Sequence, residues 1–216
     1  MFKVLKRLLI LVIFWILVWA PLGLLLKPQG YNYVANPTFF AAYFAFAVVL
    51  LYIFAKKEIE KKISHFKTRD VFIILSVYII SLLIIILTRG RVGENALLHV
   101  DLRMDELFWL SPKYFFAKSF EIIFQQAFFV VSLGYLLRSP LSTNKEILLF
   151  GVYALFIHLP VFLFLSPIFA LFICLSALLS GIVFAFAITH FKDGFVYSFS
   201  AHLLFYALIS SLYWLA

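Results

Sequence analysis

Long apolar runs, separated by short polar segments, occupy most of this chain. An α-helix needs about 17 to 25 predominantly apolar residues to cross a hydrocarbon core about 30 Å thick. Seven runs meet this length: residues 8–26, 39–55, 71–88, 114–137, 147–165, 168–189 and 195–215. The pattern therefore predicts an all-α fold, a polytopic transmembrane helix bundle with about seven spans.

The composition supports a membrane protein and one domain. The 216 residues are 65% hydrophobic and 13% charged, whereas soluble domains are about 45 to 50% apolar. The sequence has no internal repeat and no low-complexity tail, so we expect residues 1–216 to form a single integral membrane domain. Cys174 is the only cysteine, which excludes disulfides and paired-cysteine zinc sites.

Local signals refine the ends of the spans. The basic N-terminus and the residues before Pro21 imitate a secretory signal, but the apolar run continues to Leu26, so we expect an uncleaved first helix. Pro160 removes a backbone donor and should loosen the fifth helix. Only residues 166 and 167 separate the fifth and sixth runs, which predicts a tight antiparallel hairpin. In the connection 89–113 we expect an interfacial amphipathic helix.

The positive charge of the chain indicates its orientation. The net charge is +8, and most lysines and arginines lie at span ends and in the connection 56–69. Cytoplasmic loops carry such an excess, which favours a cytoplasmic N-terminus and an outside C-terminus. We expect an integral protein of a prokaryotic plasma membrane, in contact with membrane lipid. No aromatic-rich basic module accompanies the charge, so nucleic acid is not an expected partner.

Candidate chemistry lies in three apolar runs, which hold Glu121, His158 and His202. A charged residue at membrane depth costs about 2.5 to 3.5 kcal/mol on insertion scales, so such residues normally face a bundle interior and have partners. We therefore expect the three side chains to converge on one buried polar site. Lys118 offers a simpler alternative, because it lies three residues before Glu121 and can pair with it.

Neighbouring polar residues extend this candidate site. Gln125 lies four residues after Glu121, on the same helical face, whereas Gln126 points away from Glu121. Tyr206 lies four residues after His202 and shares its face. Counted from the predicted helix ends, His158, Gln125 and Tyr206 lie at one depth, with Glu121 and His202 on either side of it.

Three short motifs at these positions resemble those of the CAAX protease and bacteriocin-processing family of intramembrane peptidases. That family carries Glu-Glu-x-x-x-Arg, Phe-x-x-x-His and His-x-x-x-Asn motifs on separate helices. The corresponding stretches here are residues 120–125 (FEIIFQ), 154–158 (ALFIH) and 202–206 (HLLFY). The resemblance covers roughly residues 115–210.

The motifs depart from the family pattern at four positions. Glu121, His158 and His202 match it. The departures are Phe120 for the first glutamate, Gln125 for the arginine, Ala154 for the phenylalanine and Tyr206 for the asparagine. A register one residue later makes Glu121 the first glutamate and puts Gln126 at the arginine position, and the sequence leaves both registers open.

The resemblance implies an intramembrane endopeptidase that needs no cofactor. In the family, the first glutamate and the histidine of the second motif activate water. In the later register these roles would fall to Glu121 and His158. The last motif stabilises the oxyanion, a role that would fall to His202 and Tyr206. Zinc bound by Glu121, His158 and His202 is possible in principle, but the sequence has no His-Glu-x-x-His spacing, and we expect no metal.

Two other classes of function remain open. A catalytically inactive family member would act as a membrane scaffold or an immunity-type partner that binds another membrane protein through the same cavity. The replaced motif residues favour this alternative. Ion or proton transport through the same groups is a third alternative, although the runs show no matching pair of interrupted helices.

Overall fold

The computed structural model describes residues 2–63, 66–92, 108–163 and 165–215. Their regular elements are all helical. The α-helices are α1 (Phe2–Pro21), α2 (Pro37–Ile63), α3 (Thr68–Arg91), α6 (Pro112–Leu136), α7 (Thr143–His158), α8 (Pro167–His190) and α9 (Gly194–Leu215). A π-helical turn (Leu22–Leu26) and a 3-10 turn (Lys27–Gln29) extend α1, and a 3-10 turn (Leu159–Leu163) extends α7.

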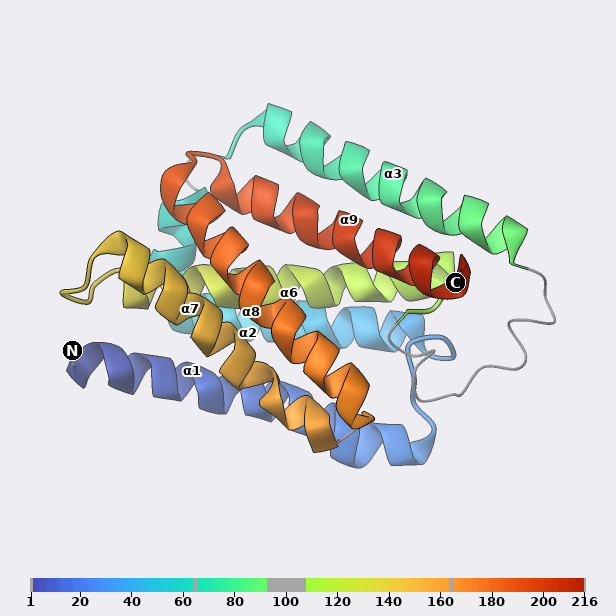
Figure 1. The fold of residues 1–216 in the computed structure, drawn as a ribbon, viewed down its shortest axis with the longest axis horizontal. Coiled ribbons are helices and arrows are strands. Elements are labelled where there is room, and N and C mark those ends of the chain that lie inside the picture. Colours follow the sequence, from blue (N-terminus) through green and yellow to red (C-terminus); the bar gives the residue numbers. More distant parts are fainter. Residues whose placement is uncertain (1, 64–65, 93–107, 164, 216) are drawn as a thin grey trace.

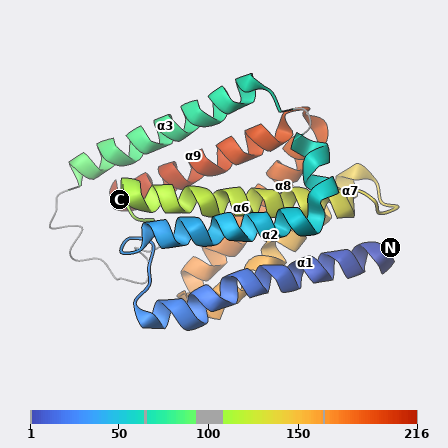
Figure 2. The same ribbon diagram turned by 180° about the vertical axis from the view of Figure 1, so that it is seen from behind.

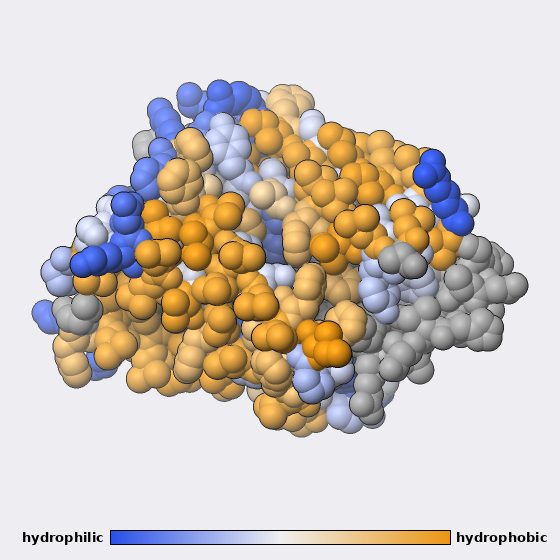
Figure 3. All heavy atoms as spheres, viewed as in Figure 1, coloured by the Kyte–Doolittle hydropathy of each residue, from blue (hydrophilic) through white to orange (hydrophobic). Residues whose placement is uncertain are grey.

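Seven of the described helices are long and apolar enough to cross a membrane, which confirms the predicted fold class. The face shown in Figure 3 is broadly apolar, with hydrophilic residues gathered toward the ends of the bundle. The chain is therefore an integral membrane protein. Most helices extend beyond the predicted runs, because helical hydrogen bonding continues into the polar flanks: the first span covers Phe2–Gln29 and the second Pro37–Lys61.

The helices run lengthwise along the bundle, with α6 at its centre (Figure 1). In this view α7 and α8 cross in front of α6, and the opposite view shows α2 on its other side (Figure 2). Helices α3 and α9 lie side by side along one edge, and α1 lies along the other. The two chain termini lie at opposite ends, which we name the N-terminal end and the C-terminal end of the bundle.

Helix α6 is central because it is the most polar of the spans. In its apolar window 78% of the residues are buried, against 17% in α3. On one side, Phe124 and Phe128 pack in a cluster with Trp15 of α1 and Phe44 of α2. On another side, Ile122 belongs to a second cluster with residues of α3 and α9. Burial among other helices shields the polar side chains of α6 from lipid.

The end of α7 confirms the expected effect of Pro160. The α-helix ends at His158 and continues as a 3-10 turn over Leu159–Leu163. Proline has no backbone N–H to donate, so the α-helical pattern cannot continue through it. Helix α8 begins at Pro167 and packs closely against α7, as the hairpin prediction requires. Most of the predicted interfacial helix, residues 93–107, lies outside the described residues.

The turn between α8 and α9 depends on Gly194. A Cβ atom at this position would lie 1.9 Å from the backbone oxygen of Ala187, so no larger residue fits without opening the turn. Overpacking of this kind costs about 1 to 3 kcal/mol. We predict that Gly194→Ala lowers the midpoint of thermal unfolding in detergent. Gly90→Ala is the matched control and should leave the midpoint unchanged or raise it, because nothing lies within 4 Å of the added atom. Equal midpoints for the two variants would contradict this account of the turn.

Candidate functional site

A cavity of about 270 Å³ lies at the C-terminal half of the bundle. Its walls come from the end of α1 and the segment after it, α6, the end of α7, α8 and α9. Much of the lining is apolar, including Trp15, Phe129 and Phe184. All five candidate residues line it: Glu121, Gln125, His158, His202 and Tyr206. The expected convergence on one cavity is therefore present.

Glu121 forms a buried ion pair with Lys118. The Lys118 Nζ atom lies 2.6 Å from Oε1 and 2.8 Å from Oε2 of Glu121. The two residues lie three apart on α6, which brings their side chains onto one face, and they are only 3% and 1% exposed. The sequence analysis gave this pairing as the simpler alternative to a polar site shared by Glu121 and the two histidines. The pair lets two opposite charges lie inside the bundle with little net charge.

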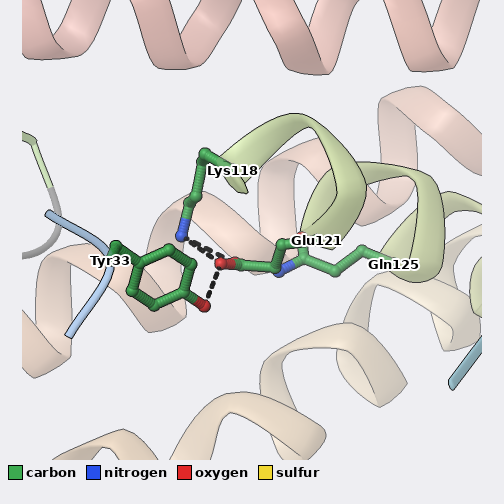
Figure 4. A network of polar contacts seen from close by, with 4 residues as sticks. All are labelled: Tyr33, Lys118, Glu121 and Gln125. Carbon is green, nitrogen blue, oxygen red and sulfur yellow. Dashed lines mark hydrogen bonds and ion pairs between the residues drawn. The ribbon is translucent and has the colours of Figure 1, made fainter. Parts of the chain in front are cut away.

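Two further donors complete the hydrogen bonding of the carboxylate (Figure 4). The Tyr33 hydroxyl donates to Oε2 at 2.6 Å, and the Gln125 amide donates to Oε1 at 2.8 Å. A carboxylate offers about four lone-pair positions. Two contacts from Lys118 and one each from Tyr33 and Gln125 fill them. Glu121 therefore has no acceptor position left for a water molecule in this arrangement.

Tyr206 covers the ammonium of Lys118. The Nζ atom lies 4.4 Å from the centroid of the Tyr206 ring and 5.4 Å from that of Tyr33. A cation over an aromatic face is stabilised by about 2 kcal/mol or more when it is desolvated. Tyr206 thus contacts Lys118 with its ring face, a role different from the oxyanion donor that the resemblance implies.

The contribution of the Tyr33 hydroxyl to stability depends on pH. Burial raises the pKa of Tyr33 well above its ordinary value, and the negative charge of Glu121 raises it further. In the unfolded chain a tyrosine ionises near about pH 10, while folded Tyr33 keeps its proton. The unfolded state then binds fewer protons, so the contribution of Tyr33 to stability is complete below pH 10 and falls as the pH rises above it.

We predict that this contribution is visible as a difference between the wild-type protein and Tyr33→Phe. The difference in their free energies of unfolding, measured in detergent, should be constant from pH 7 to 9 and shrink above about pH 10. The comparison cancels the other tyrosines and lysines that titrate in this range. A difference that stays constant to pH 11 would contradict the hydrogen bond between Tyr33 and Glu121.

His202 belongs to a second network. The Ser198 hydroxyl lies 3.0 Å from Oε1 of Gln126 and 3.0 Å from the backbone oxygen of Phe195, and the Nε2 amide of Gln126 lies 3.0 Å from Nδ1 of His202. An amide nitrogen can only donate. With the amide in this orientation, Nδ1 of His202 is the acceptor, and in the neutral imidazole the proton is on Nε2. As the sequence predicted, Gln126 points away from Glu121.

His158 has the opposite tautomer. Its Nδ1 atom lies 2.7 Å from the backbone oxygen of Ala154, and a carbonyl oxygen can only accept. The proton is therefore on Nδ1, and Nε2 carries a lone pair. The ring of Trp15, with its centroid 5.5 Å from that of His158, packs against the imidazole. One cavity thus holds a histidine with an acceptor at Nε2 and a histidine with a donor at Nε2.

The predicted residues divide into two groups within the cavity. Glu121, Gln125 and Tyr206 contact Lys118 or its ion pair, whereas His158 and His202 have other hydrogen-bond partners. The rings of His202 and Tyr206, with centroids 5.7 Å apart, join the two groups. Among the described residues, no hydrogen bond joins Glu121 to either histidine. His190, expected to be solvated, is exposed at the end of α8. His65 and His99 lie outside the described residues.

Two residues of the site, Tyr33 and Trp15, were not predicted from the sequence. Tyr33 lies in the short connection after the first span, and its contact with Glu121 joins positions 88 residues apart. Trp15 lies in an apolar run, where an aromatic residue gives no signal of a functional contact. Long-range pairing of this kind has no local pattern. The only sequence signal for Tyr33 as a residue of the site was its position in a connection between spans.

No group of three His, Cys, Asp or Glu side chains in the described part of the chain could hold a metal ion. Comparison of the chain with protein-family models, with curated proteins and with solved structures gives no match.

Proposed function

We propose that this protein is an intramembrane endopeptidase in which His158 activates the attacking water. The observation that carries the proposal is that His158 and His202 line one cavity with different partners at Nδ1, a backbone oxygen and an amide nitrogen. These partners assign an acceptor to Nε2 of His158 and a donor to Nε2 of His202. Peptide hydrolysis needs both functions: a base for the proton of water and a donor for the oxyanion. The resemblance to the CAAX protease and bacteriocin-processing family in the order of Glu121, His158 and His202 also supports it.

The proposed reaction uses the two histidines in sequence. Nε2 of His158 accepts a proton while the water oxygen bonds to the carbonyl carbon, and Nε2–H of His202 donates to the resulting oxyanion. The proton on His158 then passes to the amide nitrogen as the C–N bond breaks, which gives a carboxylic acid and an amine. Neither a metal nor another cofactor is needed for these steps.

Glu121 has a positioning role in this proposal. Its acceptor positions are filled by Lys118, Tyr33 and Gln125, which is why we assign the base to His158. Through Tyr33, the carboxylate ties the connection between α1 and α2 to the wall of the cavity. The ion pair also supplies fixed charges close to the reacting groups.

The test is hydrolysis by the purified protein, reconstituted in phosphatidylcholine vesicles and incubated with a library of apolar peptides. We expect defined cleavage products by mass spectrometry. In water enriched in ¹⁸O, the new carboxyl group of each product should contain one ¹⁸O atom from the attacking water. Products that appear equally in vesicles without the protein, or no products at all, would overturn the proposal.

The second candidate function is an inactive family member that binds a membrane protein, as a scaffold or an immunity-type partner. The ion pair favours it, because Lys118 and Glu121 satisfy each other without a substrate. This function predicts that a peptide binds in the cavity and dissociates uncleaved. Binding without ¹⁸O incorporation would decide for it.

We also propose that the protein lies in a prokaryotic plasma membrane with its N-terminus in the cytoplasm and its C-terminus outside. The excess of lysine and arginine at the N-terminal end of the bundle supports this orientation. In a Cys174→Ala background, Gln29→Cys should react with a membrane-impermeant maleimide in intact cells. Lys57→Cys should react only after the cells are opened. Both positions are exposed at opposite ends of the bundle, so the reverse result would invert the orientation.

A further inference from the structure

Helices α8 and α9 diverge from the tight turn that joins them (Figure 1). Each is held by a different neighbour. Helix α8 packs closely on α7, where a Cβ atom at Gly181 would lie 2.7 Å from that of Ala154. Helix α9 packs on α3, where the Thr88 hydroxyl donates to the Ser211 hydroxyl at 3.0 Å. The two contacts hold the helices apart at the C-terminal half of the bundle.

Both diverging helices line the cavity, and we name the space between their lining residues the mouth of the cavity. On α8 the lining residues Ile173, Ser176 and Ser180 follow one helical face and are half-buried. On α9 Phe205, which is 41% exposed, and the half-buried Tyr206 line the opposite side. In the space-filling view, hydrophilic atoms are visible in a recess between the apolar surfaces of α8 and α9 (Figure 3).

The depth of this mouth indicates what can enter it. At about 1.5 Å per residue, Ser180 lies about 20 Å along α8 from Pro167, and Phe205 lies about 16 Å along α9 from Gly194. Helix α8 has 24 residues and is therefore about 36 Å long. The mouth thus faces the hydrocarbon core, where a water-soluble ligand is not present.

A second part of the cavity lining lies at the C-terminal end of the bundle. Lys27, Tyr31 and Asn32, in the segment after the first span, line the cavity there, and their polar side chains belong at the membrane surface. Water can therefore approach from this surface while an apolar ligand approaches from the membrane. Hydrolysis inside a membrane needs these two routes, because water and an apolar substrate come from different phases.

We propose that the substrate is an apolar polypeptide segment already embedded in the membrane, and that it enters the cavity laterally between α8 and α9. This inference rests on the proposed function for the nature of the substrate. Ser176 and Ser180 lie where the segment passes, and their hydroxyl groups can bind its backbone as its own hydrogen bonds open. A polar group in hydrocarbon has few other partners, which makes such contacts selective for an unwound peptide.

Photocrosslinking tests the entry route without relying on hydrolysis. The probe is a Leu/Ala-rich peptide of membrane-spanning length, flanked by lysines, with one photoreactive leucine at its centre. It is reconstituted with the protein in phosphatidylcholine vesicles, and adducts are mapped by mass spectrometry. We expect adducts on the cavity-lining residues of α8 and α9, Ile173 and Phe205 among them. Adducts confined to lipid-facing residues of the bundle would overturn the proposal.

Two matched variants of α8 test whether the peptide enters between α8 and α9. Ser180→Trp fills the mouth and should reduce the adducts on cavity-lining residues at least fivefold. Leu179→Trp places the same side chain on the lipid-facing side of α8, where Leu179 is 63% exposed, and should change them less than twofold. Equal adduct yields in the two variants would contradict lateral entry. Ser176→Phe provides a second, smaller obstruction if Ser180→Trp does not fold.

Loss of hydrolysis can be distinguished from loss of peptide entry. His158→Ala removes the proposed base but leaves the mouth open. It should retain the crosslinks while hydrolysis is lost. If the wild-type protein shows crosslinks in the cavity and no ¹⁸O incorporation, the entry route stands and the endopeptidase proposal falls. If it cleaves peptides but crosslinks nowhere along α8 and α9, the endopeptidase proposal stands and the entry route falls.

Discussion

Replacing Glu121 with glutamine, with Lys118 kept, will lower the free energy of unfolding by about 3 to 5 kcal/mol. The substitution removes the negative charge and leaves the Lys118 ammonium uncompensated, although it is only 3% exposed. Breaking a buried pair from one side is costly, since the remaining charge has neither its partner nor water. Reversible unfolding in detergent at neutral pH measures the loss.

Two controls identify the buried charge as the cause. In the double variant Lys118→Met with Glu121→Gln, no charge remains, and the glutamine oxygen still accepts from Tyr33 or Gln125. We expect it to recover most of the lost stability. Lys56→Gln breaks the ion pair with Glu60, in which the side chains are 61% and 48% exposed, and should change stability by less than about 1 kcal/mol. A double variant as unstable as Glu121→Gln would contradict this explanation.

The second large effect is on the rate of peptide hydrolysis. Under the proposed mechanism, His158→Ala removes the base and should lower the rate of peptide hydrolysis by about 10²- to 10⁴-fold. His202→Ala removes a donor to the oxyanion and should lower it by about 10²- to 10³-fold. Initial rates with the same vesicle-embedded peptide measure both effects, with crosslinking to the peptide as a check that binding persists.

His190→Ala is the matched control for these two variants. His190 is exposed at the end of α8, outside the cavity lining, and among the described residues it bonds only to nearby groups of its own helix. Its replacement should leave the rate within about twofold of wild type. Equal rates for His158→Ala, His202→Ala and His190→Ala would exclude the two cavity histidines from the reaction.

Much of the fold follows from local pattern. The seven apolar runs predicted the seven spans, because hydrocarbon thickness fixes helix length. Pro160 correctly predicted a loosening of the fifth helix beside His158, since a missing backbone donor has a local effect, and the α-helix gives way there to a 3-10 turn. The central position of α6 also follows from the sequence, because a helix carrying Lys118, Glu121 and two glutamines is shielded from lipid by other helices.

The details of the site depend on contacts that the sequence does not encode locally. Pairing of Lys118 with Glu121 was foreseeable from their spacing, but the Tyr33 hydrogen bond was not, because residues distant in sequence meet only in the folded bundle. The helical period correctly separated Gln125 from Gln126. It could not predict that Gln126 orients His202, since that depends on the packing of α6 against α9.

The proposed mechanism requires two neutral cavity histidines with opposite tautomers. Nitrogen-15 NMR of the reconstituted protein, with His158→Gln and His202→Gln used to assign the signals, measures the protonation of each ring nitrogen. We expect a proton on Nδ1 and a free lone pair on Nε2 for His158, and the reverse for His202. Two histidines of the same tautomer would contradict it, because the cavity would then lack either the base or the oxyanion donor.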